Sequence, residues 1–287
     1  MTLPLVLGHE NAGRVAAVGD LVATVSVGDP VLVFPPYSCG LCVPCRRGHD
    51  MHCERHQFTG ITVDGGFADY LVVAERSLVR LPPDANPVEL APYADAGLTA
   101  YHAVRRAAHL ALPGTTAVVI GVGGVGHVAL QLLRELGSSA VVAVEPHAQR
   151  RRLAEELGAD TALDSNGAVD AVRELTDGRG AELVLDFVGT DQTHADGLGM
   201  LAAAGTYSMV GFGGTVTVPS VALVGAEQAA VTNLVGSWTD LWEVVQLHSR
   251  GKLTLKTETH PLEDVNDVLG VLREGAVTGR AVLVPGG

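Results

Sequence analysis

This sequence has few aromatic side chains and few basic residues, and its cysteines are not spread along the chain. Only 4% of its 287 residues are aromatic, whereas hydrophobic residues make up 47% and glycines number 35. A chain of this length with so much aliphatic surface can bury a substantial core. A disordered chain is therefore excluded, and the core is expected to consist mainly of valine and alanine.

The shortage of positive charge limits the partners that this chain can have. Lysine and arginine number 19 against 32 aspartates and glutamates, which gives a net charge of -13. General nucleic-acid binders neutralise phosphates with clustered basic residues. We therefore expect neither nucleic acid nor an anionic membrane as a partner.

No targeting or membrane segment is predicted. The first ten residues contain no basic region and only a short, proline-interrupted apolar stretch, so a signal peptide is not expected and the protein is predicted to be cytoplasmic. The uncharged windows 114–133 and 197–226 are long enough to cross a bilayer. Glycine, threonine, serine or proline interrupts each window, and buried parallel strands produce similar apolar runs.

The first part of the chain is predicted to be mostly β. Turn residues separate short strand-like runs, and the pattern changes after residues 82–86. The predicted strands are residues 13–18, 31–34, 67–73 and 78–81.

The remainder alternates strands with helices at the spacing of βαβ units, which predicts an α/β fold with a doubly wound parallel sheet. The predicted strands here are residues 117–120, 140–145, 182–187, 207–212, 253–259 and 280–284. The predicted helices are residues 125–136, 148–157, 168–175, 193–203, 241–248 and 265–273.

A glycine-rich turn joins the first of these strands to its helix. The pattern G-x-G-x-x-G runs through Gly121, Val122, Gly123, Gly124, Val125 and Gly126. In this context the first glycine permits a tight turn, the second lets the backbone approach a pyrophosphate, and the third allows close helix packing. The helix N-terminus supplies donors and a positive dipole, so a dinucleotide site is predicted.

An acidic residue at the end of the next strand indicates which dinucleotide binds. Glu145 follows Gly126 by 19 positions, as a contact with the adenosine ribose requires. A carboxylate there would repel a 2′-phosphate, which favours NAD over NADP. Arg150 lies close behind and could soften that preference.

All four cysteines fall in one short segment, which excludes disulfides spread across the fold. Their spacing, C-x2-C-x2-C-x7-C, places Cys39, Cys42, Cys45 and Cys53 within reach of one ion. Four thiolates close the coordination shell of zinc, which is typical of a structural site. An iron–sulfur cluster or four free cysteines are the alternatives.

With these two motifs, the sequence resembles the zinc-dependent alcohol dehydrogenases of the medium-chain dehydrogenase/reductase family. Gly-His-Glu at residues 8–10 and the segment 95–101 also match, as do residues 261–266 and 279–283. The resemblance implies a GroES-like catalytic domain formed by residues 1–86 and 238–287, with its zinc lobe at residues 39–53. It also implies a Rossmann NAD-binding domain at residues 87–237.

The same resemblance implies the chemistry and the site. Family members transfer a hydride between NAD and an alcohol, here predicted to be secondary, to give a ketone or aldehyde, with a catalytic zinc as Lewis acid. His9 and Asp95 match two of the zinc ligands, and Glu10 matches the acid beside the metal, which could itself ligate zinc. A homo-oligomer, either a dimer or a tetramer, is implied as well.

One family ligand has no counterpart in this sequence. The family's N-terminal cysteine precedes the Gly-His-Glu motif by a couple of dozen residues, whereas only eight residues precede His9 here. The N-terminal segment is therefore expected to be shortened. The alternative prediction is a protein that binds NAD and is stabilised by the structural zinc ion, but whose dehydrogenase activity is impaired or absent.

Overall fold

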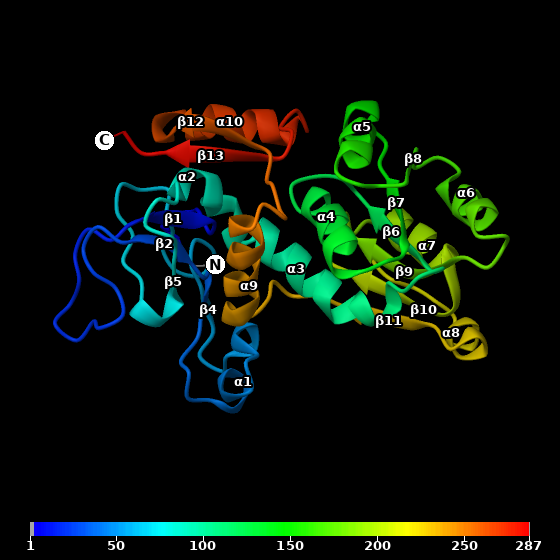
Figure 1. Cartoon of the computed structure of the whole chain (residues 1–287), viewed down its shortest axis with the longest axis horizontal. Coiled ribbons are helices and arrows are strands. Elements are labelled where there is room, and N and C mark those ends of the chain that lie inside the picture. The colour runs from blue at the N-terminus through cyan, green and yellow to red at the C-terminus, as the bar shows by residue number, and fades with distance from the viewer. Residues whose placement is uncertain (1–2, 287) are drawn as a thin grey trace. The chain divides into compact units, whose positions relative to one another are not determined.

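The computed structural model describes residues 3–286, which form two compact units (Figure 1). The α/β unit spans Thr99–Leu234, and the β-rich unit contains the described residues up to Leu98 and from Val235 onward. The division into a GroES-like domain at residues 1–86 and 238–287 and a Rossmann domain at residues 87–237 remains a prediction.

A six-stranded parallel sheet forms the centre of the α/β unit, in the order β11-β10-β9-β6-β7-β8. Its strands are β6 (Thr116–Ile120), β7 (Ala140–Val144), β8 (Thr161–Leu163), β9 (Ala181–Asp186), β10 (Leu201–Met209) and β11 (Ala229–Thr232). Its helices are α4 (Gly126–Leu136), α5 (Ala148–Glu156), α6 (Ala168–Leu175), α7 (Asp191–Gly199), α8 (Ser220–Ala226) and the short η4 (Ala108–Leu110). Helix α3 (Ala96–Ala107) leads into this unit.

Both faces of the central strands β6, β7 and β9 are buried, which explains the continuous apolar runs in their sequence. Val118 of β6 packs on one face in a cluster with Val172 of α6, and Leu198 of α7 packs against that cluster. The alternating neighbours Val119 and Leu185 point to the other face and are also fully buried. The sheet is thus a small-residue core in which valine and alanine replace the scarce aromatics.

The β-rich unit contains smaller sheets. Its strands are β1 (Asn11–Arg14), β2 (Pro30–Val33), β3 (Pro36–Tyr37), β4 (Gln57–Phe58), β5 (Leu78–Arg80), β12 (Thr257–Pro261) and β13 (Arg280–Val284). Its helices are α1 (Val43–Arg46), α2 (Pro87–Leu90), α9 (Trp238–Ser249), α10 (Val265–Arg273), η1 (Asp50–His52), η2 (Glu75–Ser77), η3 (Ala91–Ala94) and η5 (Leu262–Asp264). Strands β1, β2 and β5 form an antiparallel sheet, whereas β12 and β13 pair in parallel.

Most predicted elements are confirmed within a few residues, but several predictions were wrong. Residues 67–73 form no strand, because a strand needs a ladder partner and the described residues supply none beyond Phe67. The predicted helix 193–203 ends at Gly199, and the chain enters β10 immediately afterwards. The strand predicted at residues 253–259 instead spans Thr257–Pro261, where β13 lies beside it.

In the described part of the chain, no helix is long and apolar enough to cross a membrane. Window 114–133 contains β6 and most of α4, and window 197–226 contains β10 and α8. Packing in the α/β unit accounts for the apolar character of β6, α4 and β10, whereas α8 has no buried residue.

Shortening a central side chain should test this core. Leu183 of β9 is fully buried, so Leu183→Ala should lower the free energy of unfolding by about 2–5 kcal/mol through lost burial and a cavity. Leu175→Ala is the matched control, because Leu175 is 53% exposed and its truncation should cost less than about 0.5 kcal/mol. Equal losses in urea denaturation would contradict this account of the core.

Candidate coenzyme and metal sites

The glycine loop has the conformation that its motif predicts. Gly121 adopts a φ of +87°, and a Cβ atom there would lie 2.5 Å from Cγ2 of Val188. A Cβ atom on Gly126 would overlap the carbonyl oxygen of Gly121, whereas one on Gly123 would meet nothing within 4 Å. The loop thus needs two glycines for packing, and the third leaves open space where a ligand can approach the backbone.

Glu145 lies just after the end of β7 and is tied to the glycine loop. Its side chain is buried, and its carboxylate accepts hydrogen bonds from the backbone N–H of Val122 at 2.9 Å and of His147 at 3.0 Å. Each oxygen keeps a second lone pair that can accept from a hydroxyl. The acid therefore both shapes the loop and suits a ribose contact.

The arginines after Glu145 differ in role. Arg151 donates from Nη1 to the carbonyl oxygens of Glu145 and Pro146 and to the carboxylate of Asp164, at 2.6–2.8 Å. It therefore fastens the turn after β7, a structural role that the sequence analysis missed. Arg150, the predicted coenzyme residue, is half-buried on α5.

The four cysteines gather as their spacing predicts. Their sulfur atoms all lie within 4.8 Å of one another, with Cys42 Sγ 3.4 Å from Cys45 Sγ and 4.0 Å from Cys53 Sγ. Four sulfurs about 2.3 Å from a zinc ion form a tetrahedron with edges of about 3.8 Å, so the group fits one ion. Such close packing favours a single metal over an iron–sulfur cluster, whose irons are held by separate thiolates.

Backbone amides prepare this cluster for a cation. The N–H groups of Leu41 and Cys42 donate to the sulfur of Cys39 and lower the pKa of its thiol to about 6. The N–H groups of Cys39 and Arg55 donate to the sulfur of Cys53. Because a thiolate is the form that binds metal, these contacts fit a structural zinc site.

His9 and Asp95 are brought together although 86 positions separate them. His9 Nε2 lies 3.4 Å from Asp95 Oδ2, and the hydrogen bond with this carboxylate raises the pKa of His9. Two ligands at about 2.1 Å from a tetrahedral zinc ion are about 3.4 Å apart. The pair therefore has the separation that two ligands of one ion require.

Glu10 follows His9, and its carboxylate bonds to Ala96 and Arg280. One of its carboxylate oxygens accepts from the backbone N–H of Ala96 at 2.9 Å, and the other accepts from the guanidinium of Arg280. Burial raises the pKa of Glu10, and Arg280 opposes that rise. Among residues 3–286, the cysteine cluster is the only group in which three or more metal-binding residues converge. Arg280 was not predicted as part of this site.

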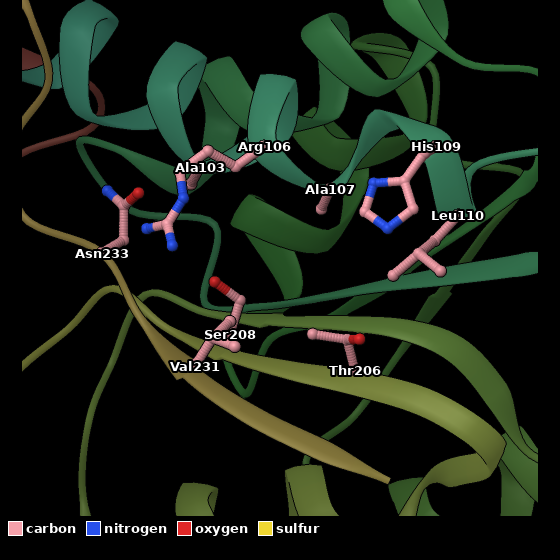
Figure 2. A pocket seen from close by; sticks show the side chains of 9 residues that line it. All are labelled: Ala103, Arg106, Ala107, His109, Leu110, Thr206, Ser208, Val231 and Asn233. Carbon is pink, nitrogen blue, oxygen red and sulfur yellow. The ribbon is translucent and has the colours of Figure 1, made fainter. Parts of the chain in front are cut away.

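A separate cavity of about 210 Å³ lies in the α/β unit between α3 and strands β10 and β11 (Figure 2). Arg106, Ser208 and Asn233 are among the residues that line it. Arg106 donates to the carbonyl oxygen of Thr232 at 2.8 Å, which fastens α3 to the end of β11. None of the predicted site residues lines this cavity.

Comparison with known proteins gives the same family for both parts of the chain. Residues 1–83 match the model of the alcohol dehydrogenase GroES-like domain, and residues 124–250 match that of the zinc-binding dehydrogenases. A D-arabinose 1-dehydrogenase (NADP(+)) of Saccharolobus solfataricus is 36% identical over 99% of this chain and 82% of its own length. The chain belongs to the zinc-dependent alcohol dehydrogenases of the medium-chain dehydrogenase/reductase family.

Other relatives agree with this membership and confirm the predicted fold class of a GroES-like and a Rossmann domain. An NAD-dependent alcohol dehydrogenase of Sulfolobus acidocaldarius is 34% identical over 98% of this chain and 82% of its own. The crystal structure of the alcohol dehydrogenase from Aeropyrum pernix superposes with a TM-score of 0.97 at 41% identity, covering 99% of this chain and 84% of that one. The predicted oxidoreductase class is thereby confirmed, and the non-catalytic alternative is not favoured.

Removing the partner of Glu10 should be costly. Arg280→Met leaves a buried carboxylate without its cation, so the free energy of unfolding should fall by about 3–5 kcal/mol. Adding Glu10→Gln in the same chain should recover much of that loss, because no buried charge then remains unpaired. Purely additive losses in a double-mutant cycle, measured by chemical denaturation, would show that the two side chains are not coupled.

Proposed function

We propose that this protein is an NAD-dependent dehydrogenase that interconverts a secondary alcohol and its ketone, or a primary alcohol and its aldehyde. The observation that carries the proposal is the glycine loop with its open approach at Gly123 and the buried acid Glu145 behind it. In the oxidation, NAD would supply the acceptor for the hydride of the carbinol carbon, and the hydroxyl proton would pass to solvent.

Binding of the dinucleotide is assigned to the loop and to the start of α4. The backbone around residues 121–126 would face the pyrophosphate, aided by the helix N-terminus. Glu145 would accept hydrogen bonds from the ribose hydroxyls and repel a 2′-phosphate, whereas Arg150 would be the nearby group able to offset that repulsion. We therefore assign NAD as coenzyme, as in the NAD-dependent relative from Sulfolobus acidocaldarius.

Two metal sites are assigned to this chain's residues. The four cysteines would hold a structural zinc ion, since four thiolates close its coordination shell. His9 and Asp95 would hold a catalytic zinc ion, which supplies a Lewis acid for the substrate oxygen. Glu10 would support this site from beside it, because its carboxylate is held by Ala96 and Arg280.

We further infer that the protein works in the cytoplasm as a homo-oligomer, either a dimer or a tetramer. The edge position of β11 in the parallel sheet supports this inference, since an edge strand exposes unpaired backbone groups that a second copy can cover. The substrates are small alcohols and carbonyl compounds, with neither nucleic acid nor membrane as partner.

Substituting His9 should separate catalysis from coenzyme binding. Purified protein should oxidise secondary alcohols with NAD, and His9→Ala should abolish this turnover because one metal ligand is lost. NADH binding, followed by fluorescence titration, should remain unchanged, since the glycine loop is untouched. Turnover that survives His9→Ala would remove His9 from the mechanism, and wild-type protein without turnover on any alcohol tested would overturn the proposed function.

Metal analysis should distinguish the two zinc sites. Protein purified without chelator should contain about two zinc ions per chain, and His9→Ala and Cys53→Ser should each reduce this to about one. Only Cys53→Ser should also lower the thermal unfolding midpoint strongly, because the zinc ion bound by the four cysteines cross-links the segment 39–53. One zinc ion in the wild type, unaffected by His9→Ala, would contradict the catalytic site.

A further inference from the structure

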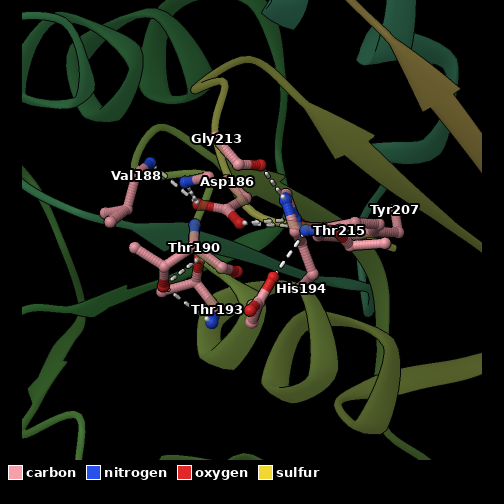
Figure 3. A network of polar contacts seen from close by, with 10 residues as sticks. Asp186, Val188, Thr190, Thr193, His194, Tyr207, Gly213 and Thr215 are labelled. Carbon is pink, nitrogen blue, oxygen red and sulfur yellow. Dashed lines mark hydrogen bonds and ion pairs between the residues drawn. The ribbon is translucent and has the colours of Figure 1, made fainter. Parts of the chain in front are cut away.

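Three buried polar side chains form a network in the α/β unit that the proposed chemistry does not use (Figure 3). Asp186 ends β9, Tyr207 lies in β10, and His194 lies in α7; each is at most 4% exposed. The Tyr207 hydroxyl donates to Asp186 Oδ2 at 2.7 Å, and its oxygen lies 2.7 Å from His194 Nδ1. Three elements are thus joined through their side chains.

The network ends on the backbone of two loops. Asp186 Oδ1 accepts from the N–H groups of Val188 at 2.8 Å and Gly189 at 3.1 Å. His194 Nε2 lies 3.1 Å from the carbonyl oxygen of Gly213, and because a carbonyl only accepts, Nε2 must be the donor. Figure 3 shows Val188 beside Asp186, and Gly213 above Asp186 with its carbonyl group directed at the imidazole of His194.

The first of these loops borders the glycine loop, and the second loop borders the first. Val188 packs on Gly121, where it occupies the space that a side chain would need. A Cβ atom on Gly189 would lie 2.5 Å from the carbonyl carbon of Gly211, so the loops touch through their backbones. Phe212, at the tip of the second loop, is 98% exposed. The second loop is therefore fixed by hydrogen bonds and not by burial of Phe212: the N–H of Gly211 donates to the backbone carbonyl of Asp186, and the ring of His194 donates to Gly213.

Removing polar groups from water costs free energy in a buried site. Apolar side chains would fill the same volume without this cost, so the polar network needs another reason to be there. The Tyr207 hydroxyl keeps its proton, because burial and the neighbouring Asp186 both raise its pKa. Each polar bond in this network connects a core side chain with another or with loop backbone. The arrangement therefore fits a role in fixing loop geometry.

We propose that Asp186, Tyr207 and His194 are positioning residues for the coenzyme site, which hold segment 187–189 against the glycine loop and segment 211–214 against segment 187–189. This inference rests on the proposed function, because it assumes that the glycine loop binds a dinucleotide. Loss of the network would let both segments move and would weaken dinucleotide binding, although none of the three side chains is assigned a contact with the coenzyme.

A pair of substitutions at His194 separates the two halves of its ring. In His194→Gln the amide nitrogen can occupy the place of Nε2 and still donate to Gly213, whereas in His194→Asn the shorter amide reaches only the place of Nδ1. Tyr207→Phe is a further variant that keeps the ring and removes the hydroxyl. His248→Asn is the matched control, since His248 Nδ1 lies 3.0 Å from the hydroxyl of buried Tyr93 in the β-rich unit.

Two readouts apply to each variant. NADH affinity is measured by fluorescence titration, and amide hydrogen exchange of peptides covering residues 187–190 and 211–215 is measured by mass spectrometry without coenzyme. His194→Asn, which loses one hydrogen bond, should weaken NADH binding about tenfold and accelerate exchange in these peptides about tenfold, and Tyr207→Phe, which loses two, should have at least this effect. His194→Gln and His248→Asn should stay within about threefold of wild type in both measurements.

The outcomes separate this inference from the proposed function. Wild-type protein that fails to bind NADH would overturn the proposed function, and the inference with it. Wild-type protein that binds NADH, with unchanged affinity and exchange in His194→Asn and Tyr207→Phe, would overturn the positioning role alone. The same would follow if His248→Asn weakened binding as much as His194→Asn, because the effect would then reflect general destabilisation.

Discussion

Parallel strand pairing in the α/β unit brings the carboxyl ends of β6, β7 and β9 to one edge of the sheet, and the candidate coenzyme site depends on this arrangement. The glycine loop follows β6, Glu145 follows β7, and Asp186 ends β9. Each strand is anchored by apolar side chains buried on both faces, so the polar groups at their ends are placed by rigid elements. Hydrogen bonds from loop backbone to Glu145 and Asp186 then fix the turns between them.

In the β-rich unit, a buried ion pair holds the candidate site residues in place. Glu10 lies at the start of the chain and Arg280 near its end, and their ion pair joins β13 to the segment that carries His9. Glu10 also accepts from the N–H of Ala96, the residue after Asp95. Glu10 is thus connected through the backbone to both members of the His9–Asp95 pair, since it follows His9 directly and bonds to the residue after Asp95.

The cysteine lobe differs from both sites because it is local. All four sulfurs come from 15 consecutive positions, and the amides that donate to Cys39 come from the same segment. Such a site can form from spacing and turn geometry alone, with little help from the rest of the fold. Its chemistry is correspondingly self-contained: four thiolates close the coordination shell and leave no position for a substrate.

Local patterns were sufficient for the features that depend on neighbouring residues. Strand, glycine turn and helix at residues 116–136 follow from periodicity and from backbone sterics, and the gathering of the cysteines follows from their spacing. The alternation at residues 67–73 failed as a predictor, because β structure also requires a partner strand that a pattern does not supply.

Contacts between distant residues had to come from the tertiary structure. Neither the pairing of Glu10 with Arg280 nor the joining of Asp186, Tyr207 and His194 leaves a periodic signal, since each residue by itself resembles an ordinary polar position. Sequence patterns were enough to predict the family, the two kinds of domain, the glycine loop and the cysteine cluster. Which buried polar groups meet depends on the folded core, because an unpaired polar group is costly only where it is buried, and that cost selects its partner.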